Sequence, residues 1–273
     1  MFCGRKTSED RRCRCGAAIL GSGPIPGRFE GHPERWKAPL TVHGDAEDPE
    51  CRLHARNVTD TPMISADRRG RSSMSETTCH MSISLDGFVA GPDQSLEHPL
   101  GRRGIELHHW HLDEPLHDAD ARARDLLLRP RGAYVMGRNM FGPIRGPWQG
   151  DWRGWWGDEP PYHAPVFVLT HYEHEPIELA GGTTFYFVGD GFDAAFARAA
   201  EAAGDRGVDI AGGASTVRQA LAAGVIDELV LDFVPVLVGS GERLFDGVSD
   251  PRLEPVEVMH SPLATHVRYR VGR

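Results

Sequence analysis

Two glycines stand where an apolar run of the sequence ends. Gly212 and Gly213 follow the run 208–211, and the chain continues as Ala214-Ser215-Thr216. A strand that ends in glycines at the start of a helix lets a diphosphate approach the backbone, where free N–H groups and the helix dipole stabilise its charge. Glycines also serve tight strand-to-helix turns. The motif alone therefore leaves a phosphate site and a plain turn as alternatives.

Two further apolar runs end in residues that can bind phosphate. Gly137-Arg138 follows the run 133–136, and Thr170-His171 follows the run 166–169. A guanidinium binds phosphate through two parallel hydrogen bonds, and a threonine hydroxyl can add another. In open α/β sheets, ligands gather at the carboxyl ends of the strands. Together the three strand ends predict a groove for a dinucleotide.

The elements that must carry these residues alternate along the chain between strand and helix patterns. Residues 77–85 alternate apolar and polar side chains, and residues 118–128 have the spacing of an amphipathic helix. Such alternation predicts the α/β class, with a mostly parallel central sheet and helices on both faces. The C-terminal segment 256–271 is expected to pair with Glu228–Val238 as an antiparallel hairpin. Further strands are predicted at 133–137, 166–170, 183–188 and 208–211, and further helices at 190–203 and 214–223.

The composition changes sharply near residue 75. Residues 1–75 lack a sustained apolar period, so we expect a disordered N-terminal extension that is not needed for folding. Residues 76–273 are expected to form one domain around one core. The extension carries 13 Lys and Arg against 10 Asp and Glu, a net charge of +3, whereas the domain carries 17 against 29, a net charge of −12. An acidic domain is poorly suited to nucleic acid, because phosphate neutralisation needs a basic face.

The expected location is the cytoplasm. No run of about eighteen apolar residues is present, which argues against a membrane span. The apolar stretch 17–20 is too short for the core of a signal peptide. Four of the five cysteines lie in residues 1–75, and their spacing does not fit a zinc site.

Four motifs in order carry a family resemblance. They are Ser84-Leu85-Asp86-Gly87-Phe88-Val89-Ala90, Val135-Met136-Gly137-Arg138, Ile210-Ala211-Gly212-Gly213-Ala214, and the run from Pro235 through Gly239-Ser240-Gly241 to Phe245. Residues 77–270 resemble the dihydrofolate reductase-like family. They are most similar to the C-terminal reductase domain of the bifunctional riboflavin-biosynthesis deaminase/reductase.

The resemblance implies NADPH as the hydride donor and assigns roles to the matching residues. Asp86 would face the substrate and the nicotinamide as the candidate catalytic residue, where a carboxylate can orient a polar substrate or relay a proton. The alternative for Asp86-Gly87 is a turn former. Thr170 would lie near the adenosine end. The predicted cofactor-binding residues are Gly137, Arg138, Thr170, Gly212, Gly213, Ala214, Ser215 and Thr216.

Two departures bear on the substrate. Met140 stands where dihydrofolate reductases carry a threonine that helps hold phosphate, and neither Glu106 nor Asp113 has the sequence context of their pterin-binding acid. The leading interpretation is an NADPH-dependent reductase of a small heterocycle, such as 5-amino-6-(5-phosphoribosylamino)uracil of the riboflavin pathway. Pterin reduction and a non-catalytic nucleotide-binding module are the alternatives. The zinc-deaminase signatures are absent from the sequence.

Three other features invite interpretation. The run His108-His109-Trp110-His111 is assigned to packing or a pocket wall rather than to a metal, so no metal site is predicted. The apolar strand Leu229–Val238 predicts a homodimer with this strand near the interface. An aromatic group in a Gly/Pro-rich segment is expected to pack that segment onto the sheet, with a pocket cap or a dimer surface as alternatives. Its members are Trp148, Trp152, Trp155, Trp156 and Tyr162.

Overall fold

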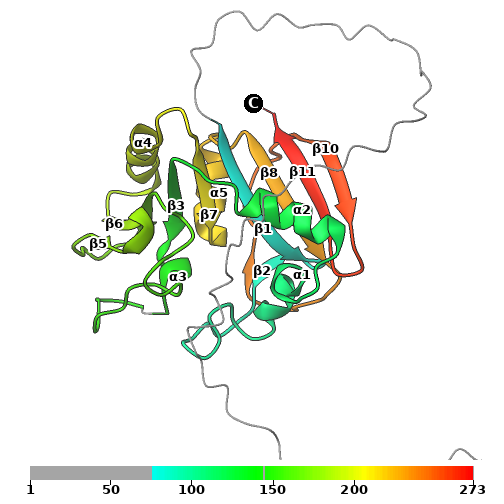
Figure 1. Ribbon diagram of the computed structural model, residues 1–273, viewed down its shortest axis with the longest axis horizontal. Coiled ribbons are helices and arrows are strands. Elements are labelled where there is room, and N and C mark those ends of the chain that lie inside the picture. Colours follow the sequence, from blue (N-terminus) through cyan, green and yellow to red (C-terminus); the bar gives the residue numbers. More distant parts are fainter. Residues whose placement is uncertain (1–75, 144, 273) are drawn as a thin grey trace, which may run out of the picture. The chain divides into compact units, whose positions relative to one another are not determined.

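A twisted mixed sheet organises the part of the chain that the computed structural model describes, residues 76–143 and 145–272. The extension 1–75, and the expectation that it is dispensable, lie outside the described residues. Within those residues the sheet has nine strands in the order β10-β11-β8-β1-β7-β3-β4-β6-β5, and β2 pairs with β9 separately (Figure 1). The strands are β1 Thr77–Ser84, β2 Phe88–Ala90, β3 Ala133–Gly137, β4 Pro165–Leu169, β5 Ile177–Glu178, β6 Thr184–Val188, β7 Val208–Gly212, β8 Glu228–Val234, β9 Glu242–Arg243, β10 Leu253–His260 and β11 Thr265–Val271.

Six neighbouring strands of this sheet run parallel. β8, β1, β7, β3, β4 and β6 pair in that order with parallel register. The C-terminal strands β10 and β11 form an antiparallel hairpin, and β11 pairs antiparallel with β8. The predicted mostly parallel sheet with a C-terminal antiparallel hairpin is therefore confirmed, but the hairpin forms between β10 and β11 rather than between the whole segment 256–271 and β8, and only β11 pairs with β8. The carboxyl ends of the parallel strands lie at one edge of the sheet, where the predicted site residues are found.

Helices cover both faces of the sheet. On one face, α4 and α5 pack over alternate strand residues such as Cys79, Val135 and Ile210. On the other face, Trp110 of α1 and Ala123 of α2 form a second core with β8 and the C-terminal hairpin. The helices are η2 Gly104–His108, α1 His109–Leu112, α2 Asp118–Leu127, α3 Arg138–Phe141, η3 Ala180–Gly182, α4 Phe192–Ala203 and α5 Ala214–Ala222. In this part of the chain, no helix is long and apolar enough to cross a membrane.

The aromatic segment between α3 and β4 covers the second face where no helix lies. Trp152, Trp156 and Tyr162 pack against buried Phe141 and Phe185. Their rings make edge contacts, such as Trp156 with Tyr162 at 5.1 Å between centroids. The expectation that this segment packs onto the sheet is confirmed for these three residues, because they contribute to the core.

The strand predicted at the dimer interface lies inside the sheet. β8 ends at Val234, before Pro235, and it is hydrogen-bonded to β1 on one side and β11 on the other. Six of its seven residues are buried within the single chain. Its apolar side chains are therefore explained by burial on both faces, and the argument that placed an interface on this strand was wrong. The homodimer itself stays a prediction.

A buried polar network ties the two halves of the second face together. His266 of β11 lies between two carboxylates, with Nδ1 2.8 Å from Asp232 and Nε2 2.9 Å from Asp120. His80 of β1 binds the same Asp232 at 2.9 Å, and all four residues are buried. Burial disfavours the charged imidazolium, but its hydrogen bonds to the carboxylates outweigh this and raise the pKa of His266. Both His266 nitrogens therefore donate, and α2, β8 and β11 are linked by charge.

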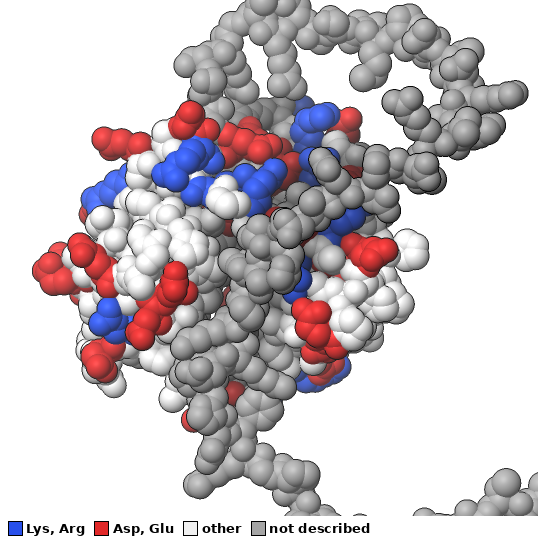
Figure 2. Space-filling view, in the orientation of Figure 1, with Lys and Arg blue, Asp and Glu red and all other residues white. Residues whose placement is uncertain are grey.

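Charged side chains on the visible surface are interspersed rather than segregated. Figure 2 shows arginine and acidic side chains next to one another along the upper edge. Arg268, for instance, binds Glu228 at 3.0 Å and Glu257 at 3.2 Å. Such pairs are partly exposed and each contributes little to stability.

The buried network makes a testable contribution to stability. His266→Ala leaves Asp232 and Asp120 without their shared cation, and removing one partner of a buried ion pair costs about 3–5 kcal/mol. Denaturant unfolding should show this loss. Arg198→Ala, which removes an exposed pair with Asp190, is the matched control and should change the unfolding free energy by less than about 1 kcal/mol. Equal losses of unfolding free energy in the two variants would refute the proposed contribution of the network to stability.

Candidate functional site

The predicted site residues gather at the carboxyl ends of four adjacent parallel strands. In the sheet order β1-β7-β3-β4, the chain leaves these strands at Ser84, Gly212, Gly137 and Leu169. Two of the strands run directly into helices, β3 into α3 at Arg138 and β7 into α5. The sequence-predicted set is therefore placed along one edge of the sheet, although it is not all in mutual contact.

Gly212 and Gly213 form a bare backbone turn at the start of α5. Gly212 has a φ of +126°, a backbone conformation that residues with a side chain rarely adopt. A Cβ there would lie 3.3 Å from the sulfur of Met140. At Gly213, by contrast, an added Cβ would meet no atom within 4 Å. Gly213 is the N-cap of α5, and no side chain caps that helix end. The space beside Gly213 is thus open in front of a helix N-terminus, which favours an anion.

The hydroxyl residues of this turn differ in accessibility. Thr216 is buried, and its Oγ1 would lie only 2.7 Å from a Cβ at Gly137. Glycine at 137 is therefore needed so that α5 can pack closely on β3. Ser215 is exposed, whereas Ala214 is buried. Of the two predicted hydroxyl contacts, the Thr216 side chain packs between elements, and Ser215 is the one on the surface.

Arg138 and Thr170 contact each other across the ends of β3 and β4. Arg138 Nη1 donates a hydrogen bond to Thr170 Oγ1 at 3.3 Å. The guanidinium carbon lies 3.6 Å from the ring centre of Trp148 and 5.1 Å from that of Tyr172. Nε and Nη2 of Arg138 are shielded from solvent and have no hydrogen-bond partner among the described residues. Desolvation lowers the pKa of Arg138, as expected for a cation without a neighbouring acid.

Tyr172 was not identified from the sequence as part of the site, and for Trp148 packing was favoured over a pocket cap or a dimer surface. Tyr172 follows Thr170 by two residues, and its backbone N–H donates to Thr170 Oγ1 at 3.1 Å. The only available signal was an aromatic residue just beyond a strand end. The predicted second phosphate partner at this position, His171, is exposed.

Asp86 is a firmly bound carboxylate at the end of β1. It accepts hydrogen bonds from Ser84 Oγ at 2.6 Å and from the backbone N–H groups of Val238 and Gly239 at 3.0 and 2.7 Å. The bond from Ser84, followed by the two backbone donors, lowers the pKa of Asp86 to about 2. Asp86 thus joins β1 to the segment after β8 and is an anion at neutral pH. This geometry fits an orienting group better than a proton donor.

The acids that lacked a pterin-binding context are already paired. Glu106 accepts from Arg103 at 2.8 Å, and Asp113 accepts from His109 at 2.9 Å. Met140 fills the place of the missing threonine, and its sulfur lies beside Gly212. In the described part of the chain, no group of three or more His, Cys, Asp or Glu side chains is arranged to hold a metal ion.

The histidine run lies on η2 and α1 as a packing element. His108 Nδ1 and His111 Nε2 are 3.0 Å apart, and the two rings meet edge to face. Trp110 is buried against the rings of His111, His80 and His266, and its Nε1 donates to Ser82 Oγ. Burial lowers the pKa of His108 to about 4 and that of His111 to about 3. Both side chains are therefore neutral at pH 7.

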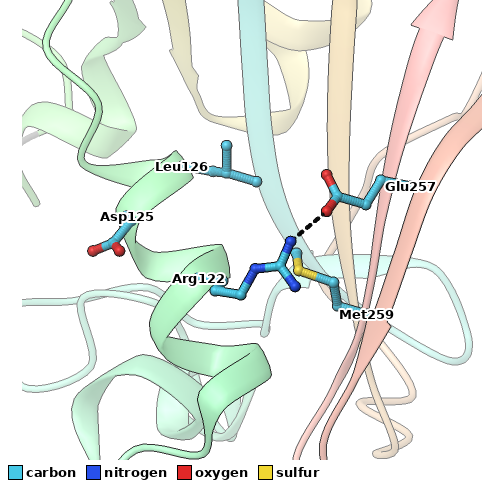
Figure 3. A pocket seen from close by; sticks show the side chains of 5 residues that line it. All are labelled: Arg122, Asp125, Leu126, Glu257 and Met259. Atoms are coloured by element: carbon cyan, nitrogen blue, oxygen red, sulfur yellow. Dashed lines mark hydrogen bonds and ion pairs between the residues drawn. The ribbon is translucent and has the colours of Figure 1, made fainter. Parts of the chain in front are cut away.

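A shallow hollow lies away from this edge, between α2 and β10 (Figure 3). The ion pair between Arg122 and Glu257, 2.8 Å long, spans it. None of the predicted site residues lines it. The lining residues are Arg122, Asp125, Leu126, Glu257 and Met259.

Comparison with known proteins gives a family. A model of the RibD C-terminal domain matches residues 76–267. No curated protein sequence matches the chain. A protein from Shewanella sp. PV-4, named for riboflavin biosynthesis, is similar at 23% identity with a TM-score of 0.50, and the match covers 72% of this chain and 99% of that one.

Two other solved structures are similar at lower scores. A diaminohydroxyphosphoribosylaminopyrimidine deaminase/5-amino-6-(5-phosphoribosylamino)uracil reductase from Thermotoga maritima shares 15% identity, with a TM-score of 0.48, over 73% of this chain and 57% of that one. A dihydrofolate reductase from Enterococcus faecalis, in complex with NADP(H) and RAB-propyl, shares 13% identity, with a TM-score of 0.45, over 73% and 98%.

The histidine pair predicts a pH-dependent stability. Because the folded pKa values of His108 and His111 lie below the unfolded value of 6.5, the unfolded state takes up protons first as the pH falls. The contribution of this pair to the unfolding free energy should therefore decline from about pH 6.5 to about pH 4, while buried Asp209, whose pKa is raised by desolvation, acts in the opposite sense above its ordinary pKa of 3.8. The raised pKa of His266 and the lowered pKa of Asp232, about 2, act outside this window.

Thermal unfolding across this range checks the sign. The double variant His108→Gln, His111→Gln should show a flatter decline than the unmodified chain, and His98→Gln, in an exposed loop, should not. A double variant that is as pH-sensitive as the unmodified chain would contradict the assignment.

Proposed function

The chain belongs to the RibD C-terminal domain family, and from this premise we propose that it is an NADPH-dependent reductase of a small heterocyclic substrate. The proposal is supported by the dihydrofolate reductase-like fold, which brings Arg138, Thr170 and the Gly212-Gly213 turn to one edge of the sheet. The observation that carries the proposal is the Arg138 guanidinium, whose Nε and Nη2 are buried without a partner among the described residues. A buried cation with two unused donors is complementary to a phosphate group.

The residues at this edge fit a dinucleotide phosphate in three ways. Arg138 supplies charge and donors in one plane, and Gly213 leaves open space at the N-terminus of α5. Thr170 Oγ1 accepts a hydrogen bond from Arg138 Nη1 and so holds the guanidinium in place. We assign Gly137, Gly212, Ala214, Ser215 and Thr216 to the same cradle: the buried members allow close packing, and Ser215 is available on the surface.

The reacting end is assigned to the neighbourhood of Asp86. When bound, NADPH supplies a hydride to the substrate. Asp86 carries a permanent negative charge there and is held by hydrogen bonds from Ser84, Val238 and Gly239. Such an anion can orient an N–H-rich heterocycle by accepting hydrogen bonds, and a pyrimidine of the riboflavin pathway is the substrate class that we propose. We further propose that the protein acts in the cytoplasm as a homodimer.

Calorimetric titration with NADPH tests the cofactor cradle. Arg138→Ala should weaken binding by about 1.5–3 kcal/mol, the usual value of a hydrogen bond to a charged group, or about one to two decades in Kd. Gly213→Ala should weaken binding as well while leaving the melting temperature unchanged, because the new methyl group meets only open space. The loss then comes from the bound phosphate alone.

Arg122→Ala is the matched control, because Arg122 lies in the hollow between α2 and β10 and should not affect NADPH affinity. Unchanged affinity in folded Arg138→Ala would place the phosphates elsewhere.

Turnover tests the reductase activity and the role of Asp86. Loss of the absorbance of reduced nicotinamide would be followed with 5-amino-6-(5-phosphoribosylamino)uracil and with dihydrofolate. We expect oxidation with the pyrimidine, and Asp86→Asn should lower kcat at least tenfold while NADPH affinity stays constant. Asp125→Asn, on α2, serves as the control acid. NADPH binding without oxidation by either substrate would indicate a nucleotide-binding module instead.

A further inference from the structure

Arg138 is a desolvated cation without an acidic partner in the described part of the chain. Only Nη1 is hydrogen-bonded, to the neutral Thr170 hydroxyl, while Nε and Nη2 are shielded from solvent and unpaired. A buried charge without a counter-charge or full hydrogen bonding is costly. The folded protein therefore bears a free-energy cost at Arg138 that an incoming anion would lower.

The indole of Trp148 covers this guanidinium. The ring centre is 3.6 Å from the guanidinium carbon, within the distance of a cation–π contact. Trp148 is fixed by a 3.0 Å hydrogen bond from its Nε1 to the Tyr172 carbonyl and by an edge contact with Phe187 at 4.9 Å. Since water does not reach Nε and Nη2, a larger phosphate oxygen cannot reach them unless a covering group moves.

Trp148 also makes ring contacts with His174 at 4.8 Å and Phe141 at 6.0 Å, whereas the backbone of its segment is flanked by glycines. Trp148 lies between Gly146 and Gly150, both with positive φ, at +76° and +68°. A Cβ at Gly150 would meet no atom within 4 Å, and one at Gly146 would meet only the Tyr172 hydroxyl, at 4.0 Å. Glycines on either side of an anchored side chain can absorb the backbone change of a small hinge motion. Three neighbours are exposed, namely Arg145, Pro147 and Gln149.

We propose that Trp148 is a displaceable cover of an oxyanion site on Arg138. The indole occupies the guanidinium face while the site is empty, and a phosphate group that binds Nε and Nη2 displaces it. The cation–π contact and the bond to Tyr172 are lost, and a charge-assisted, two-point contact replaces them. The proposal rests on the proposed function for the nature of the ligand. It adds that ligand affinity is reduced by the cost of removing Trp148.

Affinity measurements on the full chain test the cover directly. NADPH and inorganic pyrophosphate would each be titrated into the unmodified protein, Trp148→Leu and Trp155→Leu. Trp148→Leu should bind both ligands about tenfold more tightly, which corresponds to about 1.4 kcal/mol. Trp155, whose ring contacts Trp152 at 4.7 Å and no arginine, provides the matched control and should leave both affinities unchanged.

A spectroscopic measurement covers the case in which Trp148→Leu does not fold. The unmodified protein would be labelled with 5-fluorotryptophan, and the fluorine resonance missing from Trp148→Phe identifies Trp148. On saturation with NADPH or pyrophosphate this resonance should shift, because the ring leaves the guanidinium.

The outcomes separate the cover from the proposed function. If Trp148→Leu folds, tighter binding supports the cover, and equal or weaker binding overturns it. If Trp148→Leu does not fold, a shift of the Trp148 resonance supports the cover, and an unshifted resonance overturns it. Tighter pyrophosphate binding with no NADPH binding would refute the reductase and leave the cover standing. Absence of binding by either ligand to any variant would overturn both.

Discussion

Parallel register among β1, β7, β3 and β4 is the constraint on which the site depends. Parallel strands must each return by a crossover, so every carboxyl end arrives at the same sheet edge. Residues far apart in sequence are thereby made neighbours, as Arg138 and Thr170 show with their direct hydrogen bond. A slip of one residue would turn Val135 out of the core beneath α4 and move Gly137 from the contact with Thr216.

The two faces of the sheet are stabilised by different interactions. Beneath α4 and α5 the interior is apolar and continuous, with alanines on the helices allowing close approach to the strands. On the other face, β1, β8 and β11 contribute His80, Asp232 and His266 to a buried charged network. Such a network adds little stability over an apolar core, but its directional bonds specify which strand lies next to which. It thereby fixes the antiparallel hairpin beside β8.

Sequence patterns identified the long elements and the location of the site but not its contacts. β1, β3, β4, β6 and β7 were predictable because each is an apolar or alternating run bounded by glycine, proline or a turn. The pair β2 and β9, three and two residues long, carries too few residues for a periodic signal. β8 was read four residues too long because Pro235 was treated as part of an apolar run, although proline removes a ladder donor.

The misjudged site features share one cause, which is that their partners are distant in sequence. Two of the three hydrogen bonds that hold Asp86 come from residues more than 150 positions away, so the turn-forming and substrate-facing interpretations could not be separated beforehand. The proposed cover on Arg138 likewise comes from a segment whose aromatic residues were expected to pack onto the sheet, with a pocket cap or a dimer surface as alternatives. Composition showed that these rings would be buried. Which ring lies on the guanidinium depends on contacts at the ends of β4 and β6, where Trp148 meets Tyr172 and Phe187.

Two features of the proposed cradle leave Arg138 as its main phosphate-binding side chain. Met140 supplies a thioether where a hydroxyl was expected, and the Thr216 hydroxyl is buried against Gly137. In the proposed cradle the donors left to meet a phosphate are the exposed Ser215 hydroxyl, the backbone N–H groups at the α5 N-terminus and the guanidinium. A site with one dominant cation is sensitive to whatever controls access to that cation. In our proposal, that control lies in a single tryptophan between two glycines.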